Sequence, residues 1–165
     1  IEAQDLSILG LIQKRKKGVV ILVNKWDLMA KETNTARDFE MRLKEKMAPF
    51  TDVKILFTSV MEKQRIFQTV EAALEVYENR RQKIKTSELN DVMLDIIEKN
   101  PPPVHRGKQI KIKYVGQLPV HYPAFVFYCN FPDHVRDSYR SFIENQLRKH
   151  FKLTGVSIAV YFREK

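Results

Sequence analysis

The chain has 165 residues, 44% of them hydrophobic and 30% charged, so it can bury a core and is not a wholly disordered protein. Its net charge of +9 favours an anionic partner, with nucleic acid ahead of an acidic protein or a membrane surface. Apolar runs such as residues 19–23 are far too short to span a bilayer. The single cysteine, Cys129, excludes an internal disulfide and fits a reducing compartment. We therefore expect a cytoplasmic protein of one large or two small domains, with no membrane partner.

The first half of the chain alternates helical and strand patterns. Apolar residues recur at helical spacing in three segments, and two short apolar runs between them are rich in β-branched side chains. The last helix presents Val70, Leu74 and Tyr77 on one face. The predicted order is helix, strand, helix, strand, helix, over residues 6–17, 19–23, 35–46, 53–57 and 66–85. This alternation is typical of an α/β layered domain.

The pattern changes near Lys85. An amphipathic helix begins with Thr86 or Ser87 as its cap and ends before the proline triplet at 101–103. In the strand that follows, Ile110, Ile112 and Tyr114 are expected on one face, with Lys111 and Lys113 on the other. The remaining predictions are a strand over 125–130, a helix capped by Asp133 and a strand over 156–162. The order α-β-β-α-β predicts a small α+β domain, so we divide the chain into residues 1–85 and 86–165.

One motif carries specific chemistry. Asn24, Lys25 and Asp27 form the N-K-x-D pattern directly after the first predicted strand, and ligands of open α/β sheets bind beyond the carboxyl ends of strands. The Asp27 carboxylate can accept two hydrogen bonds from guanine, a donor pair that adenine cannot offer. The alternative is a capped turn in which Asp27 starts a helix. We interpret the motif as a guanine-binding loop.

A second, weaker element follows the next predicted strand. Thr58-Ser59-Val60 resembles the S-A motif of guanine-nucleotide-binding proteins, in which a backbone N–H contacts the guanine oxygen. Ser59 and Val60 are therefore candidate guanine-binding residues. Val60 stands where alanine is usual, which retains the backbone donor but brings a β-branched side chain towards the base pocket.

The motifs that handle phosphate and magnesium are absent from the sequence. No G-x-x-x-x-G-K-[ST] loop and no D-x-x-G segment occurs, and the four histidines and one cysteine have no metal-ligand spacing. We assign no catalytic and no metal-binding residue. Because phosphoryl transfer depends on those missing groups, we expect this chain alone not to hydrolyse GTP.

With these residues identified, the chain resembles the bacterial double-GTPase family called Der or EngA over essentially its whole length. Two runs carry the resemblance more specifically than N-K-x-D does: Thr-Ser-Glu-Leu-Asn at 86–90 and the proline triplet followed by Arg106-Gly107. Lys63 departs from the family, which has glycine there. Further matching segments lie at 2–6, 23–28, 64–65, 76–79, 138–139, 144–145 and 162–164.

The resemblance implies a C-terminal fragment: the C-terminal half of a P-loop GTPase domain, then a KH-like domain. The intact protein would be a GTPase that binds GTP or GDP with Mg²⁺, whose ligands are absent here. It would act in ribosome assembly. Its implied partners are ribosomal RNA, the large ribosomal subunit and the upstream GTPase domains of its own chain.

Candidate RNA-binding residues lie in a stretch without acidic residues, from Lys99 to Pro132. Its cations are candidates for phosphate contacts and its aromatic residues for base stacking. The cations proposed are Arg106, Lys108, Lys111 and Lys113, and the aromatics are Tyr114, Tyr122, Phe125 and Tyr128. The stretch has no G-X-X-G loop, so ordinary KH binding cannot be assumed.

Two other interpretations remain open for this stretch. The cations can be a solvated strand face over core aromatics. The KH-like domain can also be a protein-interaction module that docks on the GTPase domains without touching RNA. An independent enzyme is disfavoured, because no catalytic constellation stands out.

Overall fold

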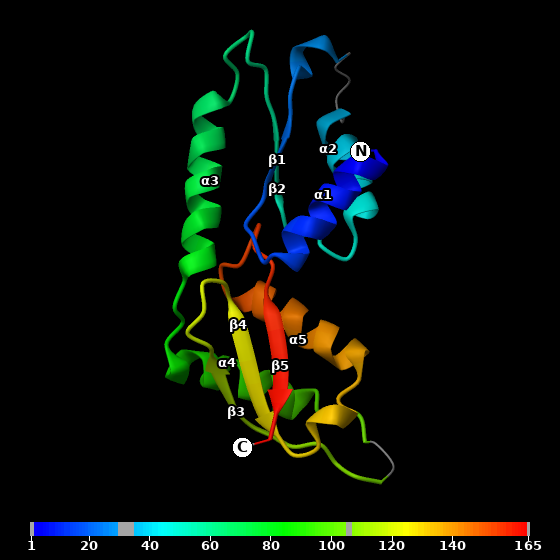
Figure 1. The fold of residues 1–165 in the computed structure, drawn as a ribbon, viewed down its shortest axis with the longest axis vertical. Coiled ribbons are helices and arrows are strands. Elements are labelled where there is room, and N and C mark those ends of the chain that lie inside the picture. Colours follow the sequence, from blue (N-terminus) through cyan, green and yellow to red (C-terminus); the bar gives the residue numbers. More distant parts are fainter. Residues whose placement is uncertain (1, 30–34, 105–106, 165) are drawn as a thin grey trace. The chain divides into compact units, whose positions relative to one another are not determined.

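The computed structural model describes residues 2–29, 35–104 and 107–164 and shows an α/β protein with two sheets (Figure 1). The chain forms two compact units. Unit 1 comprises Ile1–Arg80 and Thr154–Ser157, and unit 2 comprises Arg81–Leu153 and Ile158–Lys165. No helix in the described ranges is long and apolar enough to cross a membrane.

Unit 1 is built on two parallel strands. Val20 pairs with Lys54 and Val23 with Phe57, so both strands end at the same edge of the sheet. Helices α1 and α2 lie on one side of the strand pair and α3 on the other (Figure 1). The elements are α1 (Ala3–Lys14), β1 (Val20–Val23), the 3-10 helix η1 (Trp26–Leu28), α2 (Thr35–Met47), β2 (Lys54–Phe57) and α3 (Ile66–Arg81).

Successive side chains of β1 point to opposite sides of the strand pair. Ile21 and Val23 pack with Leu43 and Met47 of α2 in a small core. Val20 and Leu22 point the other way, towards α3. Helices on both sides of a parallel strand explain why this segment is apolar throughout, although Leu22 remains 46% exposed.

The buried face of α3 is not the apolar stripe of Val70, Leu74 and Tyr77. Ala72, Val76 and Asn79 are its buried residues, whereas Leu74 remains 60% exposed. Two strands offer too little surface to cover the whole apolar stripe, so α3 packs through its smaller side chains.

A segment from late in the sequence completes unit 1. The Val19 N–H donates to the Gly155 carbonyl (2.8 Å), and the Gly155 N–H donates to the Asp52 carbonyl (2.8 Å). The Asn79 amide donates to the Thr154 carbonyl at 3.1 Å. The residues 154–157 thus tie β1, the start of β2 and α3 together.

Unit 2 is a three-stranded sheet with two helices on one face. The strand order is β3-β4-β5, antiparallel between β3 and β4 and parallel between β4 and β5. Apolar residues of α4, α5 and the inner sheet face form one core. The elements are α4 (Thr86–Lys99), β3 (Ile112–Gln117), β4 (Ala124–Cys129), η2 (Pro132–His134), α5 (Asp137–His150) and β5 (Ala159–Arg163).

A bulge in β3 overturns part of the predicted alternation. Ile112 pairs with Cys129 and Tyr114 pairs with Tyr128, so Lys113 is an extra residue in the ladder. Beyond it, Val115 is fully buried and Tyr114 is 43% exposed. Tyr114 therefore lies on the outer face, and the prediction that placed it with Ile112 was wrong.

Three element boundaries also differ from the predictions. Helix α5 starts at Asp137 with Arg136 as its N-cap, because Asp133 lies in the separate turn η2. Helix α4 starts after Lys85 and has no side-chain cap. The last strand begins at Ala159, since residue 156 belongs to unit 1.

Gly155→Ala is expected to destabilise unit 1 strongly. Gly155 has φ +75°, and an added Cβ would lie 2.5 Å from a Val76 methyl carbon and 2.8 Å from the Val19 carbonyl oxygen. We expect a loss of about 1 kcal/mol from the backbone conformation and about 1–3 kcal/mol from the clash. The measurement is urea unfolding followed by fluorescence of Trp26, the only tryptophan, which lies in unit 1.

The matched control for this variant is Gly107→Ala. Gly107 has the same φ of +75°, but no heavy atom of the described residues lies within 4 Å of the point where the alanine Cβ would be. This control lies in unit 2, so its unfolding is followed by circular dichroism, and it should lose only the backbone contribution. Equal losses for the two variants would show that the 154–157 segment is not packed as described.

The smallest stable polypeptide that contains unit 2 should begin before residue 86. Ile84 is buried in the core of unit 2, and its N–H donates to the Gln117 side chain (2.9 Å), which in turn donates to the Gln82 carbonyl (2.8 Å). A polypeptide 82–165 should therefore be about 2–4 kcal/mol more stable than 86–165 in urea unfolding. Ile84→Ala in the longer polypeptide should reproduce most of the loss, and equal stability of both lengths would contradict this placement.

Candidate functional site

The two candidate guanine-binding loops leave the sheet side by side. The Thr58 N–H donates to the Val23 carbonyl (2.8 Å), and the Trp26 N–H donates to the Thr58 carbonyl (3.0 Å). Hydrogen bonding between the chain segments thus continues past the ends of β1 and β2. The structure brings the loop with Asn24, Lys25 and Asp27 next to the loop that begins at Ser59.

Trp26 anchors the first loop. Its side chain is 6% exposed and packs against Phe57 (ring centroids 4.3 Å apart) and Phe39 (5.8 Å). Lys25 adopts the left-handed conformation at φ 58°, and the turn η1 follows it. Because Trp26 points into the unit, Asn24 and Lys25 project outward and Asp27 is half-buried.

The second loop closes on itself through Ser59. Its hydroxyl accepts a hydrogen bond from the Glu62 N–H (3.1 Å), and its carbonyl accepts one from the Gln64 N–H (2.8 Å). Ser59 is fully buried, whereas the side chain of Val60 is 60% exposed. The Arg65 guanidinium donates to the Phe57 carbonyl (3.1 Å) and fixes the loop to the end of β2.

The candidate RNA cations fall into two places. Lys108 lies over the Phe131 ring, with its ammonium 4.8 Å from the ring centroid. Asn130 holds the neighbouring segment, because its side chain accepts from the Lys111 N–H (2.6 Å) and donates to the Gln109 carbonyl (3.1 Å). Arg106 lies outside the described residues.

Lys113 is the extra residue of the β3 bulge, next to the pair of Tyr114 and Tyr128. It lines a shallow depression with Tyr128, Asn130, Cys129 and Glu164. The β-bulge aims it there, beside Tyr114 rather than opposite it.

The candidate stacking residues do not all lie on one face of the sheet. Tyr114 and Tyr128 are neighbours on the outer face, with ring centroids 6.0 Å apart. Phe125 is fully buried in the core, so its interpretation as a stacking residue was wrong. Tyr161 and Arg163 of β5 share the outer face, and sequence reasoning missed them. The alternation of Tyr161 and Arg163 with buried Val160 was the available signal.

Burial dominates the ionisation of the core groups. It raises the pKa of the Cys129 thiol to about 11, with the charge of Glu164 as a smaller contribution. Burial likewise raises the pKa of Tyr139 to about 12. Cys129 is thus a buried core residue, as predicted. In the described ranges, no group of three or more His, Cys, Asp or Glu residues is arranged to hold a metal ion.

Comparison with known proteins decides the family. Residues 83–163 match a family model described as the KH-domain-like, C-terminal domain of EngA bacterial GTPase enzymes. GTPase Der of Christiangramia forsetii is 52% identical over 164 residues, which is 99% of this chain. The chain belongs to the Der (EngA) family. GTPase Der of Flavobacterium psychrophilum is also 52% identical over 164 residues, and that of Bacteroides fragilis is 49% identical over 167.

The chain spans 38% of the length of these Der proteins. The similarity runs through both units, since it covers 99% of the chain in the first two relatives and 100% in the third. Unit 2 carries the Der KH-domain-like match, which starts at residue 83 and so includes Ile84 of its core.

The position that departs from the expected Der pattern has a glycine-type backbone. Lys63 has φ 52°, a conformation that costs a residue with a Cβ about 1 kcal/mol. Lys63→Gly should therefore raise the free energy of unfolding by about 0.5–1 kcal/mol, measured by urea titration with Trp26 fluorescence. Lys63→Ala keeps the Cβ and removes the charge, so it should bring no gain. A gain from both variants would assign the effect to charge.

Proposed function

We propose that unit 1 is the C-terminal half of a P-loop GTPase domain and reads the guanine base of GTP or GDP. The placement of Asn24, Lys25 and Asp27 at the carboxyl end of β1, hydrogen-bonded beside the Ser59 loop, carries the proposal. Unit 2 binds RNA in the same proposal, and the whole protein acts in ribosome assembly with ribosomal RNA and the large subunit as partners.

The chemistry of the first loop suits a guanine base. The Asp27 carboxylate accepts from the ring N–H and the exocyclic amine, and rejection of adenine follows because the buried acceptor would be left unpaired. The Lys25 stem lies along the base, and Asn24 ties the loop to its neighbours. In the second loop, the backbone N–H of Val60 contacts the guanine oxygen, while Ser59 holds the turn.

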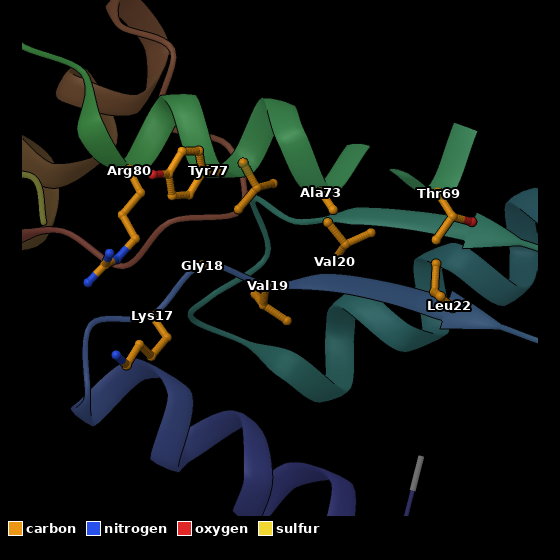
Figure 2. A pocket seen from close by; sticks show the side chains of 10 residues that line it. Lys17, Gly18, Val19, Val20, Leu22, Thr69, Ala73, Tyr77 and Arg80 are labelled. Atoms are coloured by element: carbon orange, nitrogen blue, oxygen red, sulfur yellow. The ribbon is translucent and has the colours of Figure 1, made fainter. Parts of the chain in front are cut away.

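Exposed apolar surface supports unit 1 being part of a larger domain. A groove runs between α3 and β1, lined by Ala73 and Tyr77 on one side and by Val20 and Leu22 on the other (Figure 2). Leu22 is 46% exposed on the sheet. Apolar surface of this kind is normally covered by protein.

The chain supplies base recognition and leaves catalysis to other parts of the protein. Its sequence has no phosphate loop and no D-x-x-G segment. When GTP or GDP is bound with Mg²⁺ in the intact protein, phosphate and metal contacts therefore come from the upstream part. This chain orients the base.

RNA binding by unit 2 rests on charge and placement. Lys108, Lys111 and Lys113 are exposed on one stretch that has no acidic residue from 99 to 132. Exposed cations without nearby acidic partners in sequence suit a phosphate backbone. Arg106 belongs to the same proposal by its sequence position.

In the intact protein, Asp27→Asn should weaken GDP binding at this site by at least about 100-fold, because two charge-assisted hydrogen bonds are lost. Calorimetry provides the measurement. Xanthosine diphosphate, which carries a carbonyl in place of the exocyclic amine, should bind the variant better than GDP does. Asp38→Asn on α2 is the matched control and should leave GDP affinity unchanged. Unchanged GDP affinity in Asp27→Asn would refute the assigned role.

Replacing Lys108, Lys111 and Lys113 together with Glu should weaken RNA binding by the 165-residue chain. The log–log salt slope should become shallower by up to about 2, since each phosphate contact on single-stranded RNA contributes about 0.7. Fluorescence anisotropy of a labelled ribosomal RNA fragment at several salt concentrations measures both quantities.

The control is the equally charged variant Lys83, Lys85 and Lys152→Glu in the same unit, which should retain most of the affinity. A triple variant that binds as tightly as the parent, with the same slope, would make these lysines a solvated face. No binding by the parent even at low salt, together with docking onto the GTPase domains, would favour the interaction module.

A further inference from the structure

The outer face of the sheet in unit 2 presents tyrosines from all three strands. Tyr114 of β3 pairs with Tyr128 of β4, and Tyr128 pairs with Arg163 of β5. One pair further along, Val126 pairs with Tyr161. Period-two alternation sends these side chains away from the core. We call Tyr114, Tyr128 and Tyr161 the tyrosine face.

The tyrosine face is partly exposed: its outer tyrosine rings reach solvent, whereas Val126 on the same face is 2% exposed. Both helices of unit 2 pack on the opposite side of the sheet, within the core formed by residues such as Phe127 and Val160. Tyr114 is 43% and Tyr161 is 36% exposed, and Tyr128 is half-buried between them. Gly116 lies in the row of Val126 and Tyr161 and adds no side chain that would cover the rings.

Hydrogen bonding and ring contacts hold the rings in place. The Tyr114 and Tyr128 rings are tilted by 36° with centroids 6.0 Å apart. A hydrogen bond between the Tyr122 and Tyr161 hydroxyls raises the pKa of Tyr122. The Arg163 guanidinium lies 5.7 Å from the centroid of the Tyr161 ring. The rings are therefore oriented before any ligand arrives.

Cations border the face on two strands. Lys113 is the extra residue of the β-bulge next to Tyr114 and lines the depression beside Tyr128, and Arg163 lies across β4 from Tyr114. One carboxylate, Glu164, lines the same depression. The sequence from 99 to 132, which includes β3 and β4, has no acidic residue. Aromatic faces beside cations match bases joined by phosphates better than an acidic or apolar protein surface.

We propose that the tyrosine face is a stacking platform for single-stranded RNA, on which unpaired bases lie on Tyr114, Tyr128 and Tyr161 while Lys113 and Arg163 contact the phosphates. This rests on the proposed RNA-binding function and adds where and how the RNA binds. Duplex RNA is a poorer ligand, because its base faces are already stacked.

The test uses the 165-residue chain and fluorescein-labelled octauridine RNA in anisotropy titrations. Tyr128→Ala and Tyr161→Ala should each weaken binding by about 5- to 150-fold, the range for loss of one base–aromatic stack. Tyr128→Phe keeps the ring and should bind within about threefold of the parent, and Tyr161→Phe, which keeps the ring but loses the hydrogen bond to Tyr122, should bind better than Tyr161→Ala. The salt slope should stay the same in all four variants, because stacking releases no counterions. An eight-base-pair RNA duplex should bind more weakly than octauridine.

Tyr77→Ala, which removes an exposed tyrosine of α3 in unit 1, is the matched control and should bind like the parent. Circular dichroism melting separates misfolding from loss of stacking, and the phenylalanine variants provide an independent check. Alanine variants that fold and bind octauridine like the parent, while the lysine variant is weakened, would reject the platform and leave the RNA-binding function standing. A parent chain that binds no RNA at low salt would overturn both. Docking of the upstream GTPase domains that is lost in Tyr161→Ala, without RNA binding, would reassign the face to protein contact.

Discussion

The hydrogen-bond ladder between β1 and β2 is the interaction on which the candidate guanine site depends. It continues past the strands, where Thr58 bonds to Val23 and Trp26 bonds back to Thr58. Two loops far apart in sequence are thereby held to one edge, and neither has regular structure long enough to hold itself. The ring of Trp26 helps to hold the first loop against β2, because it packs on Phe57 at the end of that strand. A change in this ladder would move both loops at once.

The fold of unit 2 depends on a different constraint: one face of its sheet must pack against the two helices. The inner face takes aromatic and β-branched residues such as Phe127 and Val115 against the helices, and these positions leave no freedom of register. The extra residue at Lys113 changes the alternation without disturbing that packing. The outer face is thus the part of the sheet that can vary at little cost to the core, and it holds the tyrosines and their neighbouring cations.

The sequence predicted what is local and failed where distant segments meet. The order of helices and strands, the place of Asn24 to Asp27 after a strand, and the burial of Cys129 all follow from periodicity and neighbouring residues. The bulge at Lys113 was not predictable, because it exists only relative to β4. The alternation of Tyr161 and Arg163 with Val160 was visible in the sequence, but that these residues share a face with Tyr128 was not, because β5 joins β4 by parallel pairing after a whole helix. On α3 the apolar residues at helical spacing were identified, but the residues that pack against the sheet were not. Which residues pack depends on the width of the sheet, and the pattern of a single helix does not give that width.

The membership of Thr154–Ser157 in unit 1 bears on how the polypeptide is made. A growing chain usually folds its N-terminal part first, as it leaves the ribosome. Here Val19 and Asp52 have backbone partners that are translated much later, at Gly155. Until Gly155 emerges from the exit tunnel, the starts of β1 and β2 lack these bonds, so unit 1 reaches its final form only after β5 has been synthesised. A nascent chain stalled before that point would display an unfinished unit 1, open to chaperones.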